Sequence, residues 1–108
     1  MNFETITRFD KEVKKLSKKY NLIKQDLESF VINFDDIHKN ATSIKNNIYK
    51  VRVSNSNKHK GKSSGYRIYY YLKLNDTVYL LTIYDKSQFE SINENFINQC
   101  IDDIKSKN

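Results

Sequence analysis

The order of apolar and polar residues along the chain divides it into a helical half and a sheet-forming half. Between residues 9 and 37, apolar side chains recur every three or four positions, which is the spacing of one helix face. From residue 48 to residue 85 they recur at every second position, and β-branched and aromatic residues dominate, as in strands. The pattern predicts an α+β fold in which helices pack on an antiparallel sheet.

The helical half predicts two helices separated by a short break. A strand over "FETITRF" comes first, and Asp10 is the expected N-cap of the first helix. The break falls at "YNL", residues 20–22, and a second apolar stripe then runs from Ile23 to Ile37. We expect these helices to form an antiparallel pair. The apolar residues of the first helix are Phe9, Val13, Leu16 and Tyr20.

The sheet-forming half predicts three strands, at about residues 48–54, 65–74 and 77–85. Asn75 and Asp76 form the expected two-residue turn between the last two strands, so that paired positions sum to 151. One face of this hairpin is then apolar and packs on the helices. That face carries Ile68, Tyr70, Leu72, Leu74, Tyr79, Leu81 and Ile83. The other face carries Arg67, Tyr69, Tyr71 and Lys73, across from Tyr84, Thr82, Leu80 and Val78.

A final helix is expected after the strands. Ser87 and Glu90 have the spacing of a capping box, which starts a helix at this point. The helix has one apolar stripe, on which Cys100 is expected to be a core residue. The stripe consists of Phe89, Ile92, Phe96, Ile97, Cys100, Ile101 and Ile104.

Composition limits the kind of protein this is. The 108 residues include no proline and no low-complexity linker, so we expect one domain over residues 1–108. One cysteine excludes an internal disulfide, and two histidines with one cysteine cannot form a tetrahedral zinc set, so we expect no metal or other cofactor. No signal peptide or membrane-spanning run is recognisable. We therefore expect a soluble cytoplasmic protein that does not bind membranes.

Positive charge is concentrated in one segment. The net charge is +6, but residues 37–75 hold nine Lys or Arg and no Asp or Glu, against ten basic and thirteen acidic residues elsewhere. Lys50 and Arg52 alternate with apolar residues and should share a surface with Arg67. A basic loop, "NSNKHKGKSSG" at residues 55–65, borders this surface. Such a basic, tyrosine-lined face suits RNA, although a solvated surface of an AT-rich gene product is the simpler alternative.

Three motifs resemble the RelE/HigB toxin superfamily of bacterial toxin–antitoxin systems, and the HigB branch in particular. They are "YKVRV", "KGKSSGYRIYYYL" and "YLLTIYDKS", and the resemblance covers residues 45–92. It implies a RelE-like fold of order β-α-α-β-β-β-α and a metal-independent mRNA endoribonuclease. Such an enzyme cuts mRNA in the ribosomal A site, next to 16S rRNA, by attack of the 2′-OH to give a cyclic phosphate. Its partner is a cognate antitoxin protein.

The resemblance also assigns site residues. It implies that Arg67, in the family's "YR" strand, clamps the scissile phosphate. The catalytic candidates are Lys50, Arg52, Arg67, Lys86 and Tyr84. The RNA-binding candidates are Lys58, His59, Lys60, Lys62, Tyr69, Tyr71 and Lys73. The RelE branch has an arginine and a tyrosine at the positions of Ser87 and Asn93, so this chain departs from that branch there.

Two other functions fit the same motifs. A ParE-like inhibitor of DNA gyrase shares the expected fold and needs no nuclease residues. A catalytically inactive RNA- or ribosome-binding module is suggested by the departures at Ser87 and Asn93. For the three tyrosines Tyr69, Tyr71 and Tyr84, cross-strand packing is an alternative to base stacking, since tyrosine favours strands.

Overall fold

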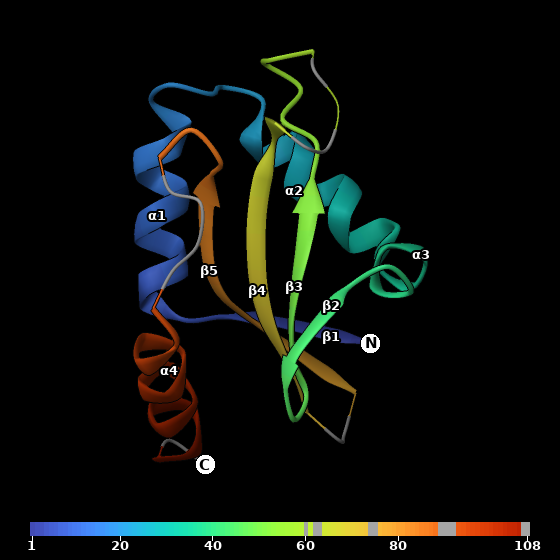
Figure 1. Cartoon of the computed structure of the whole chain (residues 1–108). Helices are drawn as coiled ribbons and strands as arrows, with labels where there is room; N and C mark the ends of the chain where they lie inside the picture. The colour runs from blue at the N-terminus through green and yellow to red at the C-terminus, as the bar shows by residue number, and fades with distance from the viewer. Residues whose placement is uncertain (60, 62–63, 74–75, 89–92, 107–108) are drawn as a thin grey trace.

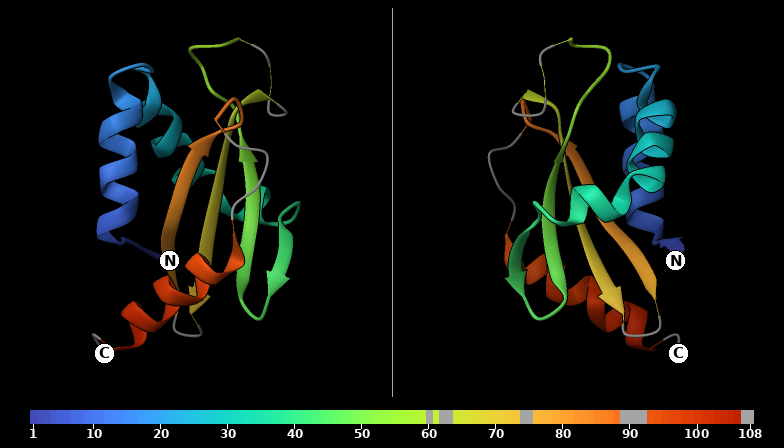
Figure 2. Two further views of the ribbon diagram at one scale, coloured as in Figure 1. Left: turned by 60° about the vertical axis from the view of Figure 1, so that its left-hand side comes forward. Right: turned by 90° about the vertical axis from the view of Figure 1, so that its right-hand side faces the viewer.

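The computed structural model describes residues 1–59, 61, 64–73, 76–88 and 93–106, and in them the α+β fold is confirmed. A five-stranded sheet lies at the centre, with α1, α2 and α3 on one face and α4 on the other (Figures 1 and 2). Among the described residues, no helix has the length and apolar character needed to cross a membrane.

The helices before the sheet follow the predicted pattern with two corrections. They are α1 (Thr7–Ser17), α2 (Ile23–Ile32) and α3 (Phe34–His38), and the break at residues 20–22 is confirmed. The predicted second helix is interrupted at Asn33. Asp10 is not the N-cap, because α1 begins three residues earlier and Asp10 lies in its first turn. The apolar period marks the buried face correctly but does not fix where a helix starts.

The sheet has two strands more than the three predicted after residue 48. They are β1 (Asn2–Thr5), which is shorter than the predicted strand, and β2 (Thr42–Lys45), which was not predicted. The others are β3 (Ile48–Val53), β4 (Tyr66–Lys73) and β5 (Thr77–Asp85), in the order β1-β5-β4-β3-β2. Since β1 pairs in parallel with β5, the sheet is mixed, and the prediction of an antiparallel sheet is wrong at this edge.

A β-bulge shifts the predicted register of the β4–β5 pair. Positions that sum to 151 are paired at the far end of the pair, where Arg67 lies opposite Tyr84. After the shift between Tyr69 and Tyr70 the sum is 150, and Tyr70 lies opposite Leu80. Because one extra residue reverses the faces of the positions beyond it, Val78 and Leu80 pack towards α1–α3, and Tyr79 and Leu81 towards α4. The predicted two-residue turn at Asn75 and Asp76 is wrong, because Lys73 and not Leu74 lies opposite Thr77, which leaves three residues between the strands. Leu74 and Asn75 lie outside the described residues.

The last helix, α4 (Glu94–Ser106), encloses a second core on the other face of the sheet. Ile97, Cys100, Ile101 and Ile104 are buried there, as the apolar stripe predicts. The predicted start at a Ser87 capping box is wrong, since α4 begins at Glu94. Asn93 Oδ1 accepts the backbone N–H of Asn95 at 2.9 Å, as an N-cap does. Phe89, Glu90 and Ile92 lie outside the described residues.

Candidate nucleic-acid interface

Cations gather on one face of the β3–β4–β5 strands. Arg52 lies directly opposite Arg67 in the antiparallel register, and Arg67 lies opposite Tyr84. Lys50 is opposite Tyr69, and its Nζ is 5.8 Å from the centroid of that ring. Residues that face each other across a ladder share one face of the sheet. The alternation of residues 49–53 therefore predicted the placement of Lys50, Arg52 and Arg67 correctly. We call these three residues the basic face.

Arg67 lies beneath this surface. Its residue is 4% exposed, and its Nη1 donates to the backbone oxygens of Tyr66 at 3.3 Å and Gly65 at 3.5 Å. Burial, and then the neighbouring charge of Arg52, lower the pKa of the Arg67 guanidinium. A clamp on a phosphate needs an exposed guanidinium, and in this structure the exposed one belongs to Arg52. Arg67 supplies positive charge from below.

The tyrosine rings of the basic face are core residues. Tyr69 and Tyr84 are 4% and 2% exposed, with ring centroids 6.4 Å apart, and they pack with Leu81 and Ile97. Tyr71 is partly buried and stacks on Tyr79 at 6.2 Å. Of the two alternatives for Tyr69 and Tyr84, base stacking does not fit this arrangement, because α4 covers the face on which their rings lie. Cross-strand packing accounts for both.

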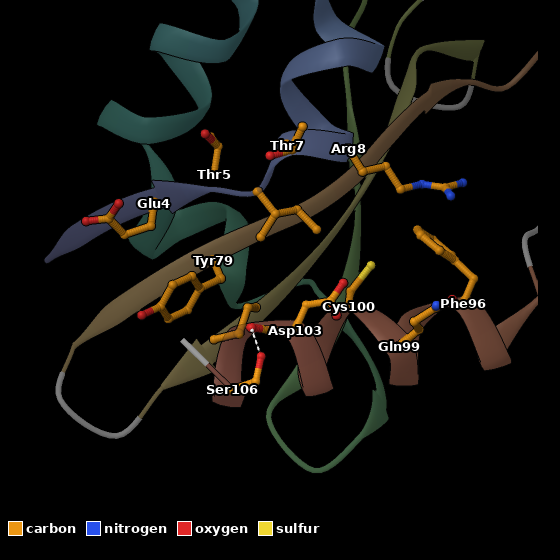
Figure 3. Close-up of a pocket in the computed structure, with 12 residues that line it drawn as sticks. Glu4, Thr5, Thr7, Arg8, Tyr79, Phe96, Gln99, Cys100, Asp103 and Ser106 are labelled. Atoms are coloured by element: carbon orange, nitrogen blue, oxygen red, sulfur yellow. Dashed lines mark hydrogen bonds between the residues drawn. The ribbon is translucent and has the colours of Figure 1, made fainter. Parts of the chain in front are cut away.

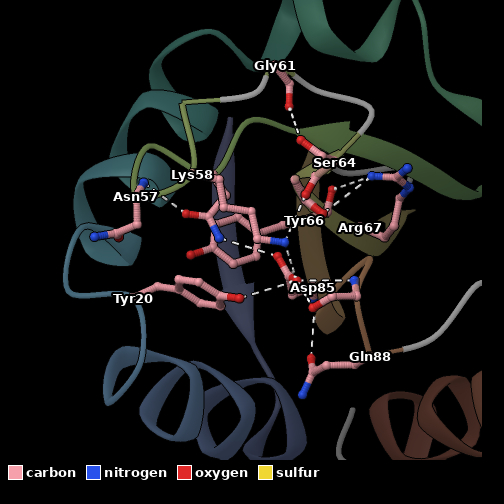
Figure 4. A network of polar contacts seen from close by, with 12 residues as sticks. Tyr20, Asn57, Lys58, Gly61, Ser64, Tyr66, Arg67, Asp85 and Gln88 are labelled. Atoms are coloured by element: carbon pink, nitrogen blue, oxygen red, sulfur yellow. Dashed lines mark hydrogen bonds and ion pairs between the residues drawn. The ribbon is translucent and has the colours of Figure 1, made fainter.

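Lys58 belongs to a buried anchor and is not a free cation of the RNA-binding loop. Its Nζ donates to Asp85 Oδ2 at 2.6 Å and to the Ser64 carbonyl at 3.1 Å, as Figure 4 shows. Asp85 is fully buried and also accepts from Asn55 Nδ2 at 3.3 Å and from the backbone N–H and hydroxyl of Ser87. Arg67 points away from this network in the same view. We call Lys58, Asp85, Asn55 and Ser87 the Asp85 anchor.

The hydrogen bonds of the anchor control the charge of Asp85. Burial by itself would raise the pKa of this carboxyl group, but the bonds from Lys58, Ser87 and Asn55 outweigh burial and hold the pKa below its ordinary value. Asp85 therefore stays ionised and pins the loop to the end of β5. Sequence reasoning missed this residue. The available signal was an aspartate directly after the apolar run "YLLTIY".

The remaining candidates lie around or away from the basic face. His59 is exposed, with a φ of 56°, and Lys86 is exposed one residue beyond β5. The backbone N–H of Lys86 donates to the Gly65 oxygen at 3.0 Å, so the residue following β5 is tied to the residue preceding β4. Lys73 lies six residues along β4 from Arg67, about 20 Å away at ~3.3 Å per residue. Lys60 and Lys62 lie outside the described residues.

Two cavities border the sheet. One, of about 600 Å³, lies between β1, the start of α1, β5 and α4, and Arg8, Tyr79, Cys100 and Asp103 line it (Figure 3). None of the predicted site residues that the structure describes lines this cavity. The other, of about 810 Å³, lies between α2, α3 and β3, and Lys50 and Arg52 contribute to its wall. This cavity lies on the α1–α3 side of the sheet, and Asp26 and Asp36 also line it, so it is not an extension of the basic face.

Comparison with known proteins assigns this chain to no family. No family model and no curated protein sequence matches it. Among the described residues there is also no group of three His, Cys, Asp or Glu side chains that could hold a metal ion. The interpretation of the basic face as a functional site therefore depends on its charges and geometry alone.

Proposed function

We propose that the protein is a HigB-like toxin, a ribosome-dependent endoribonuclease that cuts mRNA and is inhibited by a cognate antitoxin. The observed element order is compatible with the RelE-like order implied by the motifs, with α3 and β2 as additions. The motifs "YKVRV" and "GYR" place Lys50, Arg52 and Arg67 at the family's basic positions. In this structure the same three residues share one face of the sheet.

One observation carries the proposal: Arg52 and Arg67 lie directly opposite each other on neighbouring strands. Like charges in this position destabilise a sheet, and burial of Arg67 adds a cost of desolvation. A bound anion would offset both costs. A phosphodiester that gains negative charge in its transition state is the anion that benefits most, because preorganised cations stabilise developing charge.

The chemistry is an in-line transesterification within the RNA. The 2′-oxygen bonds to the adjacent phosphorus as its proton leaves, and the bond from phosphorus to the 5′-oxygen then breaks. The products are a 2′,3′-cyclic phosphate and a 5′-hydroxyl, which receives a proton. Arg52 at the surface and Arg67 beneath it stabilise the phosphorane charge, while Lys50, Lys86 and His59 are the candidates for proton transfer.

Burial of two expected catalytic residues favours a second candidate, an RNA- or ribosome-binding module without nuclease activity. Arg67 and Tyr84 are both buried, and Ser87 and Asn93, where the chain departs from RelE proteins, hold Asp85 and α4 respectively. Such a module would use the basic face for affinity alone. It would bind ribosomes and leave mRNA intact.

Cleavage on programmed ribosomes tests the proposal. Wild type, Arg52→Ala, Arg67→Ala and a matched control, Lys24→Ala on an exposed face of α2, are incubated with ribosomes carrying mRNA and with naked mRNA. Ribosome-dependent cuts ending in cyclic phosphate, kept by the control and lost by both arginine variants, are the expected result. Binding without cuts would favour the module. Toxicity that survives both substitutions would point to gyrase inhibition.

A further inference from the structure

Helix α1 carries a second basic surface that is separate from the basic face. At about 100° per residue, its cations fall within an arc of roughly 140°, on the side of the helix opposite the buried Phe9 and Leu16. At ~1.5 Å per residue, the row from its first to its last member is about 16 Å long. These residues, which we call the α1 stripe, are Arg8, Lys11, Lys14 and Lys15 of the helix, its C-cap Lys18, and Lys19 in the turn that follows.

The charges of the α1 stripe are available to a partner. All six residues are exposed, and among the described residues Lys11, Lys15 and Lys18 make no ion pair. The nearby acid Glu12 pairs with Arg8 at 3.5 Å, and its carboxylate also accepts from Thr82 Oγ1 at 2.8 Å and from the Ile83 backbone N–H at 3.2 Å. Among the described residues, Arg8 is therefore partly neutralised within its own helix, whereas Lys11, Lys15 and Lys18 are not.

The surface beside the α1 stripe is shaped as well as charged. A shallow hollow of about 430 Å³ lies against the first half of the helix, lined by Thr7, Arg8, Lys11, Glu12 and Lys15. Arg8 extends over the ring of Phe96, with its guanidinium carbon 3.5 Å from the ring centroid (Figure 3). This contact holds the first cation of the row in place against α4.

The α1 stripe ends beside the Asp85 anchor, at one aromatic ring. Lys19 Nζ lies 5.4 Å from the centroid of Tyr20, and Lys58 Nζ lies 5.7 Å from the same centroid. Tyr20 OH also donates to Asp85 at 3.4 Å. The last lysine of the stripe is therefore next to a fixed part of the structure.

We propose that the α1 stripe binds the phosphate backbone of structured ribosomal RNA and supplies affinity, not chemistry. The proposal rests on the proposed function in taking the ribosome as the target. A straight, rigid row of lysines suits a regular backbone and carries no information about sequence. The one aromatic residue of α1 is the buried Phe9, and binding sites for single strands need exposed rings on which bases stack. This favours structured RNA over the mRNA substrate.

The test compares two triple variants of equal charge. Lys11→Gln, Lys15→Gln and Lys18→Gln neutralise the stripe, and Lys24→Gln, Lys39→Gln and Lys105→Gln neutralise exposed lysines elsewhere. Each set lowers the net charge from +6 to +3, and glutamine keeps helix propensity. Binding to ribosomes without mRNA is measured from 50 to 300 mM salt. Each lost phosphate contact should weaken binding roughly five- to eightfold at ~0.1 M salt and lower the salt slope by about 0.7–0.9.

The outcomes separate this inference from the nuclease proposal. We expect the stripe variant alone to lose ribosome affinity and to raise KM for cleavage with kcat unchanged. Equal affinity of the two triple variants would overturn the inference while wild-type cleavage still stood. Loss of affinity for naked mRNA only would overturn the choice of ribosomal RNA. A wild type that binds through the stripe but never cleaves would support the inference and refute the nuclease. The single variant Lys15→Gln repeats the test with the least perturbation of the helix.

Discussion

Two groups of cations in the basic segment, residues 37–75, are held in opposite ways. Lys58 is held in the Asp85 anchor, paired with a fully buried carboxylate at 2.6 Å. Arg52 and Arg67 instead face each other across β3 and β4, and each makes the other's charge more costly. The first arrangement stabilises the fold. The second arrangement destabilises the fold, and a bound anion would offset that cost. This difference distinguishes a structural cation from a candidate functional one.

Both arrangements depend on Gly65, and we expect its substitution to have the largest effect on stability. A Cβ at this position would lie 2.1 Å from the Val53 oxygen and 2.9 Å from the Asn55 N. We expect Gly65→Ala to force β3 and β4 apart and to lower the free energy of unfolding by about 4 kcal/mol or more. Urea denaturation measures this.

Gly61→Ala is the matched control for that substitution. Gly61 has a φ of +75° and no atom within 4 Å of the position of a Cβ. Its replacement should cost only about 1–2 kcal/mol, which is the strain of a left-handed alanine. Equal losses from both glycines would show that the chain around Val53 and Asn55 accommodates a Cβ at position 65 at little cost, and that the close approach does not make Gly65 necessary.

Breaking the Asp85 anchor has the next largest effect. Asp85→Asn leaves Lys58 without its carboxylate, and we expect a loss of about 3 kcal/mol, at the low end for a buried pair because Lys58 retains partial exposure. The exposed pair of Asp36 and Lys39 is the control, and Asp36→Asn should change stability by less than about 0.5 kcal/mol.

The same variant predicts a pH dependence. Because the pKa of Asp85 is lower in the folded protein than in the unfolded chain, its contribution is fully present above the unfolded value of about 3.9. That contribution is lost as the pH falls through the folded pKa. The stability gap between wild type and Asp85→Asn should therefore narrow below about pH 4. A constant gap would mean that packing, and not charge, provides the anchor.

The Asp85 anchor and the basic face also show which parts of the candidate site could be predicted from the sequence. Alternation in "YKVRV" placed Lys50 and Arg52 beside Arg67, because strand period alone decides that point. No such rule predicts that Lys58 pairs with Asp85, because the two are 27 residues apart and only the folded sheet brings them together. Lys58 was predicted to contact RNA because it lies in a loop rich in lysine.

The β-bulge, the weak apolar pattern of β2 and the position of α4 account for the other differences between prediction and structure. One extra residue near Tyr70 exchanged the faces of Tyr79 and Leu80, and a bulge leaves no mark in the apolar pattern. β2 was missed because "TSIK" contains one apolar residue. For Tyr69 and Tyr84 the choice between packing and RNA contact stayed open, because nothing in their own strands shows that α4 covers them.

Neutralising Arg52 separates function from stability. Arg52→Gln removes the repulsion of Arg67, so we expect unchanged or slightly higher stability, by up to about 0.5 kcal/mol. Under the proposed function, cleavage on ribosomes should fall about 10²-fold or more, as when a single preorganised donor is removed from a transition state. Denaturation and cleavage are measured on the same preparation. A loss of stability like that of Asp85→Asn would make Arg52 a second structural cation.

We expect substitution of Glu12 to have the smallest effect on stability. The pH dependence of its contribution is opposite in sign to that of Asp85. Burial raises the pKa of Glu12, and the hydrogen bonds from Thr82 and the Ile83 N–H only partly offset it. The folded protein therefore holds this proton more tightly than the unfolded chain, so the contribution of Glu12 to stability declines as the pH rises above the unfolded value of about 4.3. Glu12→Gln should change stability at pH 7 by less than about 1 kcal/mol and remove this decline.

Denaturation of wild type and Glu12→Gln between pH 4 and 7 checks this, with the exposed Glu28→Gln as control. Relative to wild type, Glu12→Gln should gain stability as the pH rises from 4 to 7, whereas the gap between wild type and Asp85→Asn opens below about pH 4 and stays constant above it. The two carboxylates would then affect stability with opposite signs, because hydrogen bonds outweigh burial at Asp85 and burial outweighs them at Glu12. A gap that widens in favour of wild type for both variants would mean that Arg8, 3.5 Å from Glu12, pairs with it as effectively as Lys58 does with Asp85.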